Sequence, residues 1–416
     1  MKGTTLHRFD LPRGGTDIRS LAAAFCARPY TLFFDSADPV HPAARYSYLL
    51  FAPFETIEST DGRITITNTD NRIAFHGDPF ATVADRLAAA APGTLDPEAM
   101  EDFPFPFRGG AAGLFGYDLA RGLEPLPPKP RTRAPIPDMM IGLYNQMAVY
   151  DHHAARCHFL VRASTPAAAQ ERYRHFQTVL RQAPPAPVSF PTIPGESWQA
   201  LTPRDSYLRQ VAQVVEAIYA GDLFQANLSQ RFTAHLPGGF DPFAHYLYLR
   251  KVNPAPFGAY MNFGEIKIAS ASPERFLHVA NRHVTTCPIK GTRPRFPDDP
   301  AQDAAMAAAL RASAKDRAEN IMIVDLLRND LSRVCEDHSV VVPRQCALES
   351  FAQVHHLVSS VTGTLRADQG PLDLLRACFP GGSITGAPKV QAMRLIDRLE
   401  PAPRGPYCGA LGMIGF

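Results

Sequence analysis

Four stretches of the chain predict helices. Residues 206–220 and 318–331 repeat apolar side chains at helical spacing, which is typical of an amphipathic helix. Residues 303–314 are alanine-rich, and residues 390–399 continue from a glycine-rich stretch as a further predicted helix. The apolar positions of the first two stretches are Tyr207, Val211, Val214, Val215, Ile218, Tyr219, Ile321, Val324, Leu327 and Leu331.

Other segments predict strands. Residues 30–34 and 64–67 are rich in aromatic and β-branched side chains. Residues 224–232 predict a strand with one apolar and one amide-rich face, and residues 354–360 predict another. Helices and strands are mixed without a strict βαβ rhythm, and no period of 20–50 residues repeats. We therefore expect an α+β fold with antiparallel sheet.

Two proline-rich stretches interrupt these elements, over residues 123–137 and 184–194. Proline fixes φ and lacks a backbone donor, so both stretches predict loops or linkers. The second stretch divides the chain into residues 1–185 and residues 198–416.

Composition excludes several classes of protein. The 416 residues are 45% hydrophobic and 20% charged, with a formal net charge of +2, which argues against a nucleic-acid partner. No apolar run approaches a membrane span, and the N-terminus lacks the apolar stretch of a signal peptide. The seven cysteines contain no Cys-x-x-Cys pair. We expect a cytoplasmic protein with reduced thiols and neither a disulfide framework nor a zinc site.

The glycine-rich stretch 107–118 does not read as a phosphate loop, because no Gly-Lys-Ser/Thr follows it. Close packing of backbones within a sheet is the better interpretation.

Two charged residues lie where strands are expected to end. Glu274 follows a strand of small residues and could act as a general acid if burial raised its pKa, although a turn glutamate paired with Arg275 is the more common case. Lys290 lies between an apolar strand end and a Gly-Thr turn. An isolated lysine is usually a solvated surface charge. As a nucleophile it would need burial or a nearby cation, for which the candidates are Arg293, Arg295, Lys315 and Arg317.

Glu319 belongs to a charged stretch, residues 315–330, at the start of a predicted helix. Its carboxylate would suit Mg²⁺, which takes one or two protein carboxylates with water and substrate oxygens. Taken alone, a solvated first turn with acidic residues near the positive end of the helix dipole is the better explanation.

Residues 379–389 combine three glycines with Thr385 and lead into a helix, which could form an anion site or a structural turn. His355 and His356 are adjacent in a predicted strand and must face opposite sides, so they do not form a two-histidine metal site.

Taken together, these segments resemble the family of chorismate-utilising enzymes, which includes the anthranilate, aminodeoxychorismate, isochorismate and salicylate synthases. The resemblance covers nearly the whole chain and is densest after Gly221. It implies two large packed antiparallel sheets flanked by helices. The motifs that carry it are Ser-Pro-Glu-Arg-Phe at 272–276, Pro-Ile-Lys-Gly-Thr at 288–292, Asp-Arg-Ala-Glu-Asn at 316–320 with Asp-Leu-Leu-Arg-Asn-Asp at 325–330, His-His-Leu-Val-Ser at 355–359, and Pro-Gly-Gly-Ser-Ile-Thr-Gly-Ala-Pro-Lys at 380–389.

The resemblance implies a role for each matching residue. Glu274 would be the general acid for loss of the C4 hydroxyl of chorismate, and Glu319 would bind the Mg²⁺ that holds the ring carboxylate. The residues that would contact chorismate are Gly291, Thr292, His356, Thr385, Gly386, Ala387 and Tyr407.

Lys290 separates the branches of this family. Anthranilate and isochorismate synthases carry alanine there, whereas aminodeoxychorismate synthases carry a lysine. The resemblance implies that this lysine adds to C2 of chorismate and expels the C4 hydroxyl, and that ammonia then attacks C4 and expels the lysine. The resemblance therefore implies synthesis of 4-amino-4-deoxychorismate, for 4-aminobenzoate and folate. Ammonia would come from a separate glutaminase subunit, because the chain has no Gly-x-Cys-x-Gly nucleophile elbow. The alternatives are an anthranilate synthase component I and a truncated, non-catalytic chain that binds tryptophan.

The N-terminal part resembles the tryptophan-binding region of the family. The matching positions are Ser36, Ala43, Ala44, Arg45, Tyr46, Pro256, Phe257 and Gly258. Ala43 and Ala44 replace more polar or aromatic residues, which leaves tryptophan binding open.

At its C-terminal end the chain stops at Phe416, where the resemblance implies a further hairpin and helix with additional chorismate and Mg²⁺ contacts. The corresponding expectation is a chain that lacks these elements and binds chorismate and Mg²⁺ poorly.

Overall fold

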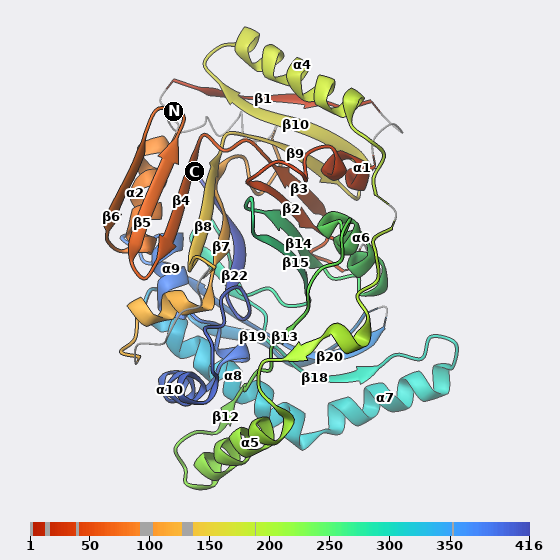
Figure 1. The fold of residues 1–416 in the computed structure, drawn as a ribbon. Helices are drawn as coiled ribbons and strands as arrows, with labels where there is room; N and C mark the ends of the chain where they lie inside the picture. The colour runs from red at the N-terminus through yellow and green to blue at the C-terminus, as the bar shows by residue number, and fades with distance from the viewer. Residues whose placement is uncertain are drawn as a thin grey trace.

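The computed structural model describes residues 3–12, 17–38, 41–91, 103–126, 136–187, 189–351 and 353–416 (Figure 1). Part of the first proline-rich stretch, residues 127–135, lies outside the described residues. The fold is mixed α+β with two large antiparallel sheets, as the sequence predicts.

The first large sheet has seven strands. Its order is β1 (Thr5–Asp10), β10 (Arg156–Ala163), β9 (Gln146–Asp151), β3 (Tyr46–Leu50), β2 (Thr31–Asp35), β14 (Phe257–Asn262) and β15 (Lys267–Ser272). One face is covered by α1 (Ile18–Ala23), α4 (Pro166–Gln182) and α6 (Pro242–Val252), whose side chains share a core cluster with those of the sheet. The strand expected over residues 30–34 is β2.

The second large sheet has six strands. Its order is β22 (Ala410–Gly415), β7 (Gly110–Phe115), β8 (Met139–Tyr144), β4 (Glu55–Thr60), β5 (Arg63–Asn68) and β6 (Arg72–His76). Leu114, Met140 and Tyr144 of this sheet share a core cluster with Leu32 and Val149 of the first sheet, so the two sheets pack face to face. The other face packs against α2 (Pro79–Ala90).

The glycine-rich stretch forms β7, where backbones approach closely. A Cβ at Gly110 would collide with the carbonyl of Ile414, and one at Gly113 would collide with the carbonyl of Met140. This arrangement confirms the interpretation of close backbone packing.

A third sheet contains Lys290 and His356, two of the candidate site residues. The long strand β20 (Val354–Thr364) pairs with β17 (His283–Thr286), β18 (Ile289–Pro294) and β19 (Val341–Ser350), and β16 (His278–Ala280) pairs with β17. The helices α7 (Pro300–Ala312) and α8 (Ala314–Ser332) lie against it, and α9 (Pro371–Cys378) packs on α8. Lys290 lies inside the irregular strand β18, whose register shifts between Ile289 and Thr292. The sequence predicts a position between a strand end and a Gly-Thr turn, but Gly291 and Thr292 belong to the same strand.

The remaining elements are two pairs of short strands, two helices and three 3₁₀ turns among the described residues. Two-residue strands pair as β12 (Gln225–Ala226) with β21 (Gly386–Ala387), and as β11 (Gln199–Ala200) with β13 (Phe232–Thr233). The helices are α5 (Arg204–Tyr219) and α10 (Lys389–Leu399), with 3₁₀ turns at η1 (Tyr117–Gly122), η2 (Gly195–Ser197) and η3 (Gly382–Ile384).

The four predicted helices are confirmed as α5, α7, α8 and α10. The continuous strand predicted over residues 224–232 is wrong. Its backbone binds two different partners, because Phe224 and Asn227 donate to Ala387 and Thr385, whereas the carbonyl of Arg231 accepts from Leu201. A single ladder cannot serve both.

Both large sheets combine strands from either side of the second proline-rich stretch. β14 pairs with β2, and β22 pairs with β7 (Figure 1). The division at residues 185–198 remains a prediction. Within the described part of the chain, no helix has the length and apolar character needed to cross a membrane.

Candidate functional site

The candidate site lies where β18, α8 and the η3–β21 segment meet. Lys290 on β18 projects its Nζ to within 3.2 Å of Glu319 Oε1 on α8. The same Nζ donates to the carbonyl of Ser383 at 2.9 Å. The Lys290 side chain is 13% exposed, so it is not a solvated surface charge.

Glu274, in the loop after β15, contacts Ser383 as well. The hydroxyl of Ser383 donates to Glu274 Oε2 at 3.4 Å. Burial raises the pKa of Glu274 to about 7, against the opposing effects of the Ser383 hydrogen bond, the Lys290 charge and the backbone N–H of Ile289. At neutral pH this carboxyl therefore holds a proton part of the time, which a general acid requires.

Glu319 lies in the second turn of α8 and is held by two donors. Gln225 Nε2 donates to its Oε1 at 3.1 Å, and Lys290 pairs with the same oxygen. Among the described residues, no three histidine, cysteine or acidic side chains gather at a metal-binding distance. The site thus offers one carboxylate, which fits a Mg²⁺ ion only if water and substrate oxygens complete its shell.

Gly291 and Thr292 follow Lys290 on β18, and Thr292 lies opposite His356 on β20. Gly291 has φ +85°, and a Cβ there would come within 2.9 Å of the Asp316 side chain, so glycine is required. Thr292 Oγ1 and His356 Nδ1 are 2.9 Å apart. Burial lowers the pKa of His356, against a hydrogen bond with the Gly291 backbone. A neutral imidazole is therefore favoured at this position.

The two adjacent histidines face opposite sides of β20, as predicted. His355 is buried and contacts Ser350 and Asp303, away from Thr292.

Thr385, Gly386 and Ala387 follow Ser383 in the chain, and Gly386 and Ala387 form β21, which pairs with β12. The Thr385 hydroxyl is buried and donates to the carbonyl of Gly381 at 2.8 Å. This hydrogen bond favours a structural role for the Thr385 hydroxyl. Tyr407 lies farther out: it is 60% exposed, and the guanidinium of Arg404 lies 5.8 Å from its ring centre.

Two of the four cations suggested as neighbours of Lys290 pair with carboxylates other than Glu319. Arg293 pairs with Asp316 at 3.2 Å, and Arg295 pairs with Asp303 at 2.8 Å. The charge beside Lys290 is the carboxylate of Glu319, so the expectation of a neighbouring cation finds no support in these contacts.

Three residues that the sequence did not single out take part in the site. They are Gln225, Asn227 and Ser383, and Asn227 Nδ2 donates to the carbonyl of Ser383 at 3.3 Å. The amide-rich face noted over residues 224–232 was the available signal for the first two. The role of Ser383 as an acceptor belongs to its backbone carbonyl, which every residue has, so the sequence could not indicate it.

Lys389, which ends the glycine-rich motif, lies at a different place. Its Nζ donates to Asp330 Oδ2 at 2.6 Å and to the carbonyl of Cys378 at 2.7 Å. It lines a cavity of about 660 Å³ between α8, α9 and the start of α10. Lys290, Glu274 and Glu319 are not among the residues that line this cavity.

A second cluster of polar residues lies at the ends of three inner strands of the seven-stranded sheet, where β2 ends and β3 and β14 begin. Ser36, Tyr46, Phe257 and Gly258 meet there, because these three strands are neighbours. Ala44 and Pro256 are buried beside them, and Arg45 pairs with Asp151 at 3.1 Å. Ala43 precedes Ala44 in the chain, and its N–H donates to His41 Nδ1 at 3.0 Å. Tryptophan binding at these positions stays a prediction.

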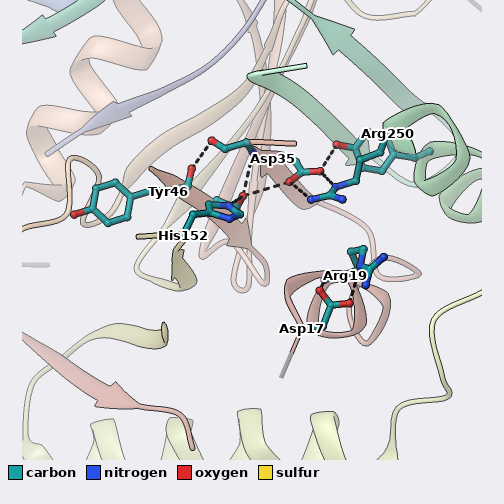
Figure 2. A network of polar contacts seen from close by, with 9 residues as sticks. Asp17, Arg19, Asp35, Tyr46, His152 and Arg250 are labelled. Carbon is teal, nitrogen blue, oxygen red and sulfur yellow. Dashed lines mark hydrogen bonds and ion pairs between the residues drawn. The ribbon is translucent and has the colours of Figure 1, made fainter. Parts of the chain in front are cut away.

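Asp35 is the centre of this cluster (Figure 2). Its fully buried carboxylate accepts from Tyr246 at 3.0 Å, from Arg250 and, at 3.3 Å, from Ser47. Ser47 lies 2.8 Å from His152 Nε2, and Figure 2 shows His152 and Arg250 on opposite sides of Asp35. Burial lowers the pKa of His152, which the negative charge of Asp35 opposes.

The chain is similar to known chorismate-binding proteins over most of its length. A family model described as chorismate binding enzyme matches residues 31–416. Aminodeoxychorismate synthase component 1 of Salmonella typhimurium is 40% identical over 388 residues, which cover 93% of this chain and 82% of that protein. Anthranilate synthase component 1 of Bacillus subtilis is 32% identical over 407 residues, covering 94% and 78%.

Solved structures agree with the fold. Anthranilate synthase component I from Streptococcus pneumoniae matches with a TM-score of 0.77 and 31% identity, over 90% of this chain and 81% of that one. The menaquinone-specific isochorismate synthase from Escherichia coli matches with a TM-score of 0.72, covering 99% and 82%; at 16% identity it supports the fold alone.

Proposed function

Because the chain belongs to the chorismate-binding enzyme family, we propose that it makes 4-amino-4-deoxychorismate from chorismate and ammonia, with Lys290 as a covalent nucleophile. The observation that supports this proposal is the position of the Lys290 amine. It is largely buried and lies between Glu319 and Ser383, and Ser383 also contacts the proton-bearing Glu274. A nucleophile and an acid thus meet in one site.

In the first step the lone pair of Lys290 Nζ forms a bond to C2 of chorismate. The two ring double bonds shift, the C4–O bond breaks, and Glu274 gives its proton to the hydroxyl, which leaves as water. Glu274 suits this task because its pKa of about 7 keeps a proton available at neutral pH. Lys290 must lose one proton before it attacks.

In the second step ammonia forms a bond to C4, the double bonds shift back, and the C2–N bond to Lys290 breaks. The lysine recovers its electron pair, and the proton lost by ammonia is available to Glu274. Two displacements replace one difficult substitution and leave the enolpyruvyl group in place. The name component 1 of the relatives supports a second component, and we propose a glutaminase subunit as the source of ammonia.

The substrate would lie against Gly291, Thr292 and His356 on one side and against Thr385, Gly386 and Ala387 on the other. Tyr407 would close the outer end, where it is exposed. Glu319 would hold a Mg²⁺ ion, which supplies positive charge for the ring carboxylate.

The decisive experiment incubates the protein with chorismate and Mg²⁺ but without ammonia, followed by mass analysis of the peptide that contains Lys290. We expect a covalent adduct on that peptide. We further expect Lys290→Ala to reduce 4-amino-4-deoxychorismate formation by roughly a thousand-fold or more, because the covalent route is lost. Lys267→Ala is the matched control, since Lys267 lies on β15 with its Nζ on the Gly264 carbonyl.

Full product formation by Lys290→Ala would refute the covalent mechanism. Anthranilate as the fluorescent product of the unmodified protein would refute the proposed product.

A further inference from the structure

The carbonyl of Ser383 accepts hydrogen bonds from two side chains at once. Lys290 Nζ donates at 2.9 Å and Asn227 Nδ2 at 3.3 Å. A carbonyl oxygen has two lone pairs, so these two donors occupy its full capacity. The direction of the Ser383 carbonyl is therefore linked to the side-chain amide of Asn227.

The Lys290 amine has two acceptors, Ser383 O and Glu319 Oε1. A protonated amine carries three N–H bonds, whereas the neutral amine carries two and a lone pair. The two acceptors fix the directions of two of the positions around Nζ, and together they set the direction of the remaining one, from which the amine would bond to the substrate.

Asn227 is itself fixed through its backbone. Its N–H donates to the carbonyl of Thr385 at 2.9 Å, and its carbonyl accepts from Arg404 Nη2. Arg404 is buried, pairs with Glu400 and lies 4.8 Å from the ring centre of Tyr117. Glu400 also accepts from Ser229 N at 2.9 Å, which ties the following residues of the segment to the same carboxylate. The Asn227 side chain thus extends from a backbone with little freedom.

From these contacts we propose that Asn227 is a positioning residue for Lys290. Its amide holds the Ser383 carbonyl, and that carbonyl aims the amine at the substrate. The inference rests on the proposed covalent function of Lys290. Asn227 acts on the step in which the lysine bond forms and not on chorismate binding.

The test measures how fast the Lys290 adduct forms at saturating chorismate without ammonia. For Asn227→Ala we expect a rate about tenfold lower, the usual effect of losing one hydrogen bond, and a less than about twofold change in the KM for chorismate. Asn227→Asp keeps the shape but turns a donor into an acceptor that repels the Ser383 carbonyl. We expect a larger loss of rate from it, with thermal unfolding monitored to show that the variant folds.

Gln230→Ala is the matched control. Gln230 lies three residues along the same segment, and its Nε2 also donates to a backbone carbonyl, that of Thr202. We expect it to leave the adduct rate unchanged. If the unmodified protein forms the adduct and both Asn227 variants form it at the same rate, the role of Asn227 is refuted alone. If the unmodified protein forms no adduct, the proposed function and this inference fail together.

Discussion

Asp35 and Glu274 are both carboxylates at the ends of strands of the seven-stranded sheet, and their surroundings differ. Asp35, at the end of β2, accepts hydrogen bonds from Tyr246, Arg250 and Ser47 (Figure 2). Glu274, two residues after β15, is bound by one hydroxyl at 3.4 Å and one backbone N–H. Asp35 thus has three side-chain donors around it, one of them a guanidinium, whereas Glu274 has only two donors among the described residues.

The number of donors around a buried carboxylate helps decide whether it stabilises the fold or can act as an acid. Donors and a cation stabilise the charged form of a carboxylate, and burial without enough of them stabilises the neutral form. Asp35 can therefore hold α6 against the sheet through Arg250. Glu274 can hold a proton at neutral pH, as its raised pKa indicates. The same change, from carboxylate to amide, should have opposite consequences at the two positions.

Glu274→Gln should have the largest effect, and that effect should be on catalysis. We expect a loss of about 10²–10⁴-fold in kcat, because the amide cannot give a proton to the leaving hydroxyl. In the unmodified protein, activity should fall as pH rises through about 7, where Glu274 loses its proton. Residual activity of the variant should lack that fall. A pH profile of initial rates with both proteins measures this, and an unchanged profile would contradict the assignment of Glu274 as the acid.

Asp35→Asn should act on stability. The variant leaves Arg250, 21% exposed, without its anionic partner, which costs about 3–5 kcal/mol for a broken buried pair. Chemical denaturation gives the free energy of unfolding. The control is Asp325→Asn, which breaks the exposed pair with Arg328 and should cost less than about 1 kcal/mol. Equal losses from the two variants would show that the Asp35 network is not what stabilises this region.

Glu274→Gln should also change stability, by a smaller amount and with the opposite sign. The folded pKa of about 7 lies above the unfolded value near 4.5, so the folded state binds more protons between these values. The free energy of unfolding of the unmodified protein should therefore fall as pH rises from about 4.5 to 7 and stay level above. The variant has no charge to bury and should gain up to about 3 kcal/mol relative to the unmodified protein across that window. Unfolding of both proteins at pH 5 and pH 8 measures this; a difference that stays constant would contradict it.

The sequence predicted the parts of the molecule that have local signatures. Apolar periodicity predicted α5 and α8, alanine content predicted α7, and the motifs around Glu274, Lys290 and Glu319 indicated the family. The continuous strand over residues 224–232 was wrong, because tertiary backbone partners, and not local composition, divide that segment. The pairing of Lys290 with Glu319 and with the Ser383 carbonyl joins three distant segments, and no spacing in the sequence encodes it.

The interleaving of the sheets has a consequence for any attempt to divide the gene. A fragment of residues 1–185 would lack β14 and β22, and so would present the unpaired edges of β2 and β7. Open edges of this kind recruit other chains and promote aggregation. Two fragments co-expressed from separate genes could restore both pairings, so complementation would succeed where neither half is soluble alone.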